Sequence, residues 1–107
     1  MLNVPLDPPS FEWADGSTLS LTTAEFPRPF ATVPYRWEMI KDIKVYLQTN
    51  NQNERLIYTI NHNDPFADNK VSFTWKKTPT PGEYRLRGVM TDKDGRTEEK
   101  AINVTVK

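Results

Sequence analysis

The sequence predicts an all-β fold, a sandwich of about seven antiparallel strands in two sheets. Its last third is the clearest: residues 71–75, 84–90 and 102–106 each alternate apolar and polar side chains. Pro81-Gly82 and the segment 92–95 separate these runs with turn-forming residues. Similar short runs with turn signals continue upstream, and no segment repeats its apolar residues at helical spacing. Two packed sheets of antiparallel strands satisfy this pattern.

The first 15 residues are predicted to be an extended arm, and residues 16–107 to be the domain. Pro5, Pro8 and Pro9 fix φ and lack a backbone donor, so the arm is not expected to join a central ladder. Phe11 and Trp13 follow at alternate positions. They either pin the arm to the domain or serve as candidate contacts for a partner, because exposed aromatic side chains are common interface anchors.

Asp15-Gly16 marks a turn before the first strand. Pro34 indicates that the second strand lies at a sheet edge or carries a bulge. The strands are expected at Thr18–Thr22, Ala31–Ile40, Asp42–Leu47, Arg55–Ile60, Val71–Trp75, Tyr84–Met90 and Ala101–Val106. Alternation along these strands predicts a core of Leu19, Leu21, Val33, Tyr35, Trp37, Ile43, Val45, Leu47, Leu56, Tyr58, Ile60, Phe73, Trp75, Tyr84, Leu86, Met90, Ile102, Val104 and Val106.

Residues 42–107 resemble a bacterial immunoglobulin-like (Big-type) domain, of the kind appended to secreted glycoside hydrolases and surface proteins and also found on phage virions. The resemblance rests on five segments in series: Ile43–Leu47, Val71–Trp75, Pro81–Leu86, Thr91–Gly95 and Ile102–Val106. It implies an immunoglobulin-like sandwich and a non-enzymatic role as spacer, adhesion module, accessory binding module or virion decoration. Residues 1–41 match this family less well.

Tyr84 is predicted to lock one corner of this sandwich. It stands two residues before Leu86, at the position where antibody-type domains have a core cysteine. In this tyrosine-corner arrangement the hydroxyl donates a hydrogen bond to backbone a few residues upstream.

Composition excludes several classes of function. The chain has 107 residues, enough for one domain, and no cysteine for disulfides or thiolate metal sites. Its 14 basic and 14 acidic residues balance, so no nucleic-acid partner is expected. No stretch is long and apolar enough to span a membrane, and the first residues lack a signal-peptide pattern. We expect either a leaderless protein or an excised fragment, placed outside the cell or on a cell or virion surface rather than in the cytoplasm.

Candidate catalytic and metal-binding residues are few. His62 is the single histidine, and no nucleophile and orienting group accompany it in the sequence. Asp92-Lys-Asp-Gly95 has the opening of a calcium loop, but position twelve is Asn103 instead of glutamate, so a hairpin turn is favoured. A looser calcium site with Glu98 or Glu99 is the alternative. No enzyme activity, metal or cofactor is expected.

One outward sheet face is the second candidate contact surface. Tyr46, Arg85 and Arg87 have the parity that points away from the core, so an aromatic ring would lie among cations there. The sequence therefore predicts a non-catalytic structural or interaction module with a protein partner. The alternatives are a carbohydrate-binding accessory domain, using Tyr46, Trp13 and Trp37, and an intracellular protease inhibitor, because some bacterial inhibitors end in a similar Trp…Pro-Gly-x-Tyr segment.

Overall fold

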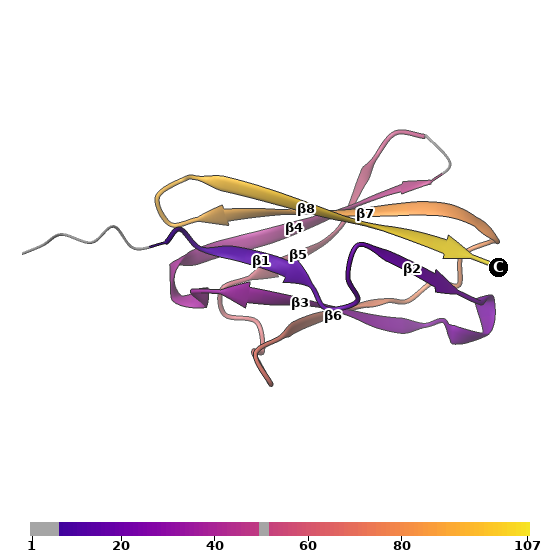
Figure 1. Cartoon of the computed structure of the whole chain (residues 1–107), viewed down its shortest axis with the longest axis horizontal. Coiled ribbons are helices and arrows are strands. Elements are labelled where there is room, and N and C mark those ends of the chain that lie inside the picture. Colours follow the sequence, from indigo (N-terminus) through magenta and orange to yellow (C-terminus); the bar gives the residue numbers. More distant parts are fainter. Residues whose placement is uncertain (1–6, 50–51) are drawn as a thin grey trace, which may run out of the picture.

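The computed structural model describes residues 7–49 and 52–107, which form eight strands in two packed sheets (Figure 1). One sheet has the order β1-β3-β6 and the other the order β2-β8-β7-β4-β5. The all-β sandwich predicted from alternation is therefore confirmed. The strands are β1 (Ser10–Trp13), β2 (Thr18–Leu21), β3 (Arg28–Tyr35), β4 (Ile40–Thr49), β5 (Arg55–Asn61), β6 (Val71–Trp75), β7 (Gly82–Asp92) and β8 (Thr97–Val106).

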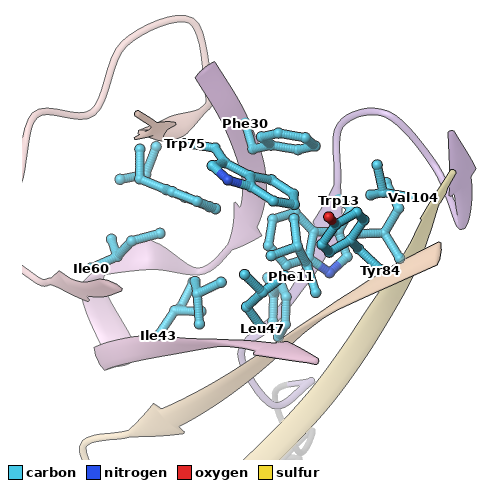
Figure 2. Packing of buried hydrophobic residues seen from close by; sticks show 14 of the residues in the cluster. Phe11, Trp13, Phe30, Ile43, Leu47, Ile60, Trp75, Tyr84 and Val104 are labelled. Atoms are coloured by element: carbon cyan, nitrogen blue, oxygen red, sulfur yellow. The ribbon is translucent and has the colours of Figure 1, made fainter. Parts of the chain in front are cut away.

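The N-terminal segment differs from the predicted arm, because residues 10–13 form β1 and pair antiparallel with β3. Phe11 is fully buried and Trp13 is 5% exposed, so neither is available as a partner contact. Both rings lie between the sheets, beside Leu47 and Tyr84 in Figure 2. The alternation of Phe11 and Trp13 is that of an ordinary half-buried strand. The other prediction for them, that they attach this segment to the domain, agrees with their burial.

A glycine on β7 makes room for these two rings. A Cβ atom at Gly88 would lie 2.9 Å from the Phe11 ring and 3.3 Å from the Trp13 ring. Contacts that short do not occur without a shift of the neighbouring atoms, so any side chain at residue 88 would displace β1.

One pairing is parallel rather than antiparallel. After Trp13 the chain turns at Gly16, whose φ of +86° suits glycine, and crosses to the other sheet. There β2 runs parallel to the end of β8, with Leu19 beside Val104 and Leu21 beside Val106. The first two strands thus belong to different sheets and tie them together (Figure 1).

The strand expected at residues 31–40 is β3, which begins earlier, at Arg28, and ends earlier, at Tyr35. The strand begins at Arg28, so Phe30 and Thr32 point inward and Tyr35 is 52% exposed. A left-handed residue, Arg36 with φ of 59°, then ends it, and a short 3-10 turn follows. The prediction of Val33 and Tyr35 as core residues was wrong, because a one-residue change in where alternation starts exchanges the two faces of the strand. Trp37 lies beyond the strand, in the 3-10 turn, and packs partly buried against the core.

The remaining core predictions fail only at the sheet margins. Leu56 and Tyr58 of β5 are 50% and 38% exposed, and Leu19 is half-buried. A bulge between Val45 and Tyr46 interrupts the β4–β5 pairing, which shifts the alternation along this edge strand. The buried apolar residues are Phe11, Trp13, Leu21, Phe26, Phe30, Ile40, Ile43, Val45, Leu47, Ile60, Val71, Phe73, Trp75, Tyr84, Leu86, Met90, Ile102, Val104 and Val106.

Because Phe11 is fully buried, its truncation should destabilise the folded domain. Phe11→Ala should lower the free energy of unfolding by about 3–5 kcal/mol, because it removes a fully buried ring from the centre of the core. Glu12→Ala, on the exposed side of the same strand, should lower it by less than about 1 kcal/mol. Urea denaturation of both variants measures the difference, and equal effects would mean that β1 does not belong to the folded domain.

Candidate binding surfaces

Three of the predicted contact residues do lie together on the outer face of the five-stranded sheet. Tyr46 on β4 is the register partner of Arg87 on β7, and Gln48 is the register partner of Arg85. Their side chains alternate with buried ones, so all point to the same outer side of the sheet. Antiparallel pairing of β4 with β7 brings these residues, which are far apart in sequence, into one patch.

Arg87 is the centre of this patch. Its guanidinium carbon lies 4.8 Å from the centre of the Tyr46 ring, a cation–π contact. Its Nε donates to Glu54 at 3.0 Å and its Nη1 to Glu99 at 2.7 Å. The hydrogen bond to Glu54 chiefly raises the pKa of Arg87 above its ordinary value, so the side chain is held charged and fixed in place.

Arg85 is the more available cation. Its Nη1 is 3.9 Å from Glu54, which Arg87 binds more closely, and 43% of its side chain is exposed. An exposed pair at this distance contributes about 0–1 kcal/mol. Arg85 can therefore turn toward a partner at little cost, whereas Arg87 and Tyr46 form a fixed pair beside it on the same face.

Tyr84 makes the hydrogen bond that the tyrosine corner specifies. Its hydroxyl donates to the carbonyl of Thr80, four residues upstream, at 2.6 Å. Its ring packs edge-on against Trp75 with centroids 5.4 Å apart. The residue thus ties the segment before β7 to the core, and its role is structural.

The Asp92–Gly95 segment is a hairpin turn that is held by its own first residue. Asp92 Oδ1 accepts the backbone N–H groups of Asp94 and Arg96, and its Oδ2 accepts Arg96 Nε at 2.9 Å. Burial opposes ionisation of this carboxyl, but the hydrogen bonds from Arg96 and Asp94 outweigh it and lower its pKa. Within residues 7–49 and 52–107 no three His, Asp or Glu side chains gather as metal ligands.

His62 belongs to an aromatic stack. Its ring stacks on Trp37 at 5.4 Å, Phe66 stacks on Trp37 at 5.7 Å, and Nδ1 lies 2.9 Å from the Ile40 carbonyl. Sequence reasoning assigns Trp37 to the core and His62 to solvent. The structure joins the loops that carry them, which no local pattern indicates.

A surface that the sequence analysis misses lies between β5 and β6. A groove of about 460 Å³ opens there, with Leu47, Ile57, Phe73 and Trp75 as its apolar lining. Arg55, Lys76 and Lys77 also border it. The adjacent lysines directly after a predicted strand are the signal that could have marked this end of the groove.

No family model and no curated protein matches this sequence. Among solved structures, a superoxide reductase (neelaredoxin) from Ignicoccus hospitalis is similar, with a TM-score of 0.65 at 12% identity over 92% of this chain and 80% of the other. Murine CRIg is similar with a TM-score of 0.54 at 8% identity over 94% and 98%. A family 76 glycoside hydrolase from a bovine Bacteroides thetaiotaomicron strain matches at 0.50 and 15%, over 94% of this chain and 20% of the other. These likenesses show an immunoglobulin-like β-sandwich fold and nothing further.

Removal of the corner hydroxyl should destabilise the domain modestly. Tyr84→Phe should lower the free energy of unfolding by about 1 kcal/mol, because it deletes the part-buried hydrogen bond to the Thr80 carbonyl and the longer contact with the Thr80 hydroxyl. Tyr46→Phe is the matched control, since the structure gives its hydroxyl no hydrogen bond within the described residues. Chemical denaturation of the two variants should separate them, and equal stabilities would contradict a corner role for Tyr84.

The lowered pKa of Asp92 predicts a loss of stability in acid. Its contribution is complete above the ordinary carboxyl pKa of 3.8, declines as the pH falls below that value, and is gone below the lowered pKa of the folded state. Asp92→Asn should be less stable at neutral pH, and its melting temperature should fall less steeply between roughly pH 5 and pH 2. Asp94→Asn, at an exposed site, should keep the wild-type profile; identical profiles for all three proteins would refute the assignment.

Proposed function

We propose that this chain is a non-catalytic immunoglobulin-like module that binds a protein partner through the outer face of its five-stranded sheet. The observation that carries the proposal is the patch around Arg87, in which Tyr46 and Arg87 are fixed by Glu54 and Glu99 while Arg85 is exposed. A rigid aromatic residue beside an available arginine is typical of interface hot spots. A fixed platform also reduces the entropy that binding must overcome.

A decorating or adhesive role within a larger assembly, on a secreted or cell-surface protein or a virion, is the setting we favour. The resemblance of residues 42–107 to Big-type domains supports this setting, and the fold is compatible with it. The described residues include no helix of the length and apolarity that crossing a membrane requires.

The residue inventory supports a role other than that of the similar superoxide reductases. Electron transfer to oxygen species requires a bound redox group. This chain offers no cysteine and one histidine, and that histidine is stacked on Trp37 beside the Ile40 carbonyl. These side chains can supply neither a thiolate ligand nor several histidine ligands to iron.

Carbohydrate binding has weaker support than protein binding. Trp13 is buried, Arg87 lies over the Tyr46 ring, and Trp37 stacks with His62 and Phe66. The three aromatic residues therefore do not form one exposed platform for sugar rings. We accordingly expect no signal on a glycan array. The proposed module also predicts no inhibition of a panel of serine proteases, and inhibition would favour the inhibitor alternative.

Site-specific photocrosslinking tests the proposed face. The chain would be produced in its native source with p-benzoylphenylalanine at Gln48, the register partner of Arg85 on the outer face, or, as the control, at Pro29, which is exposed on the outer face of the other sheet. Irradiation should link the residue-48 probe to one protein, identified by mass spectrometry, and the residue-29 probe should give no such product. No product from residue 48, or the same product from both positions, would overturn the proposal.

A further inference from the structure

The two long sides of the sandwich are closed to different degrees. On one side, Trp13 Nε1 donates to the Lys100 carbonyl at 3.0 Å, and Lys100 Nζ binds Glu12 at 3.1 Å, so β1 is bonded to β8 of the opposite sheet. On the other side, β5 and β6 are the edge strands of their sheets. There the Tyr58 and Phe73 rings stack at 5.4 Å across the groove. The sandwich therefore has one open side.

Among the described residues, outward-facing backbone groups of β6 along this side have no hydrogen-bond partner. The Ala31 carbonyl accepts the N–H of Ala14 at 2.9 Å, so the backbone of Ala31 faces β1. Ala31 is the register partner of Ser72 on β6, which makes theirs a non-hydrogen-bonded pair. The alternation of antiparallel pairing then directs the N–H and C=O groups of Ser72 and Thr74 away from β3. They point toward the open side and border the groove.

Of the two edges, β6 is better suited to accept a further strand. A bulge interrupts the pairing of β5 at Ile57, and bulges commonly protect edge strands from added strands. By contrast, β6 pairs with β3 in regular register over all five of its residues. A strand beside β6 would direct alternate side chains into the groove, toward Ile57 and Tyr58.

The basic side chains around the groove indicate an acidic binding partner. Arg55, Lys76 and Lys77 are exposed and border it. In the described part of the chain none of the three has an ion pair, whereas nearby Glu54 is bound to Arg85 and Arg87. Three such cations beside a groove that is lined in part by apolar side chains complement a segment that carries both carboxylates and apolar side chains.

We propose that the groove between β5 and β6 binds an extended acidic segment of a partner protein, which adds as a strand to β6. Backbone groups of Ser72 and Thr74 bond the segment, its apolar side chains enter the groove, and its carboxylates lie near Lys76 and Lys77. This mode is β-strand addition, in which backbone bonds supply affinity and pockets supply specificity. It is independent of the outer face proposed above and uses other residues.

Fluorescence anisotropy with synthetic peptides tests the proposal on the whole chain. The probe is a labelled nine-residue peptide that alternates valine with aspartate and glutamate. It should bind wild-type protein, and Lys76→Glu with Lys77→Glu should weaken binding at least about tenfold, more so at low than at high salt. Lys44→Glu with Lys93→Glu makes the same charge change at exposed lysines away from the groove and should alter binding less than about threefold.

Changes to the peptide separate strand addition from simple charge attraction without altering the protein. N-methylation of alternate peptide nitrogens gives two peptides, one for each set of nitrogens. Methylation of the set whose N–H groups face β6 should abolish binding, because it removes the donors that the added strand needs, whereas methylation of the set that faces away from β6 should leave binding in place. A peptide with lysine at the acidic positions should not bind. Absence of binding by the acidic peptide at 1 mM, undiminished binding by both methylated peptides, or equal binding by the lysine peptide would overturn the proposal. So would light scattering that shows a dimer of the chain lost on Thr74→Pro, since the occupant would then be a second copy.

Discussion

The packing of Phe11 and Trp13 between the sheets is the interaction on which the rest of this sandwich depends. The Phe11 ring lies against Gly88 on the central strand β7, where even a methyl group would approach it to 2.9 Å. Trp13 adds a polar tie, because its indole N–H bonds the Lys100 carbonyl of β8. A short four-residue strand thereby fastens one sheet to the other. It also carries the chain across, so that β2 can extend the second sheet.

This arrangement leaves the molecule asymmetric. One side is closed by β1, its indole bond and the ion pair of Glu12 with Lys100, which raises the pKa of Lys100. The opposite side has an aromatic stack between edge strands and a groove bordered by cations that form no ion pair among the described residues. On the outer face of the larger sheet, by contrast, most charges are compensated, as Glu54 and Glu99 hold Arg87. The two surfaces therefore differ in chemistry: the flat face carries a fixed, charge-compensated cluster, and the open side carries a groove bordered by cations.

Sequence reasoning succeeded where the pattern was local. Alternation placed β6, β7 and β8 and their buried residues, and the spacing from Tyr84 to Leu86 indicated a corner hydrogen bond that the structure contains. Reasoning failed where a residue's face depended on where a strand starts. Phe30 lies just before the expected strand at 31–40, yet it is buried within β3, and the register it sets moves Tyr35 to the surface. Phe11 was expected in an arm because nearby prolines argue against ladders, but β1 needs only four residues beyond them.

The sequence by itself determined the all-β class, the position of most strands, the parity of the outer-face residues Tyr46, Arg85 and Arg87, and the absence of thiolate chemistry. These follow from period-two alternation, turn residues and composition, which are local quantities. Only the tertiary structure decided that β1 closes one side, that Glu54 and Glu99 hold Arg87, and that Arg55, Lys76 and Lys77 border one groove. The physical reason is that strand order and closure come from contacts between distant segments, and side-chain alternation is the same whichever strand becomes the neighbour.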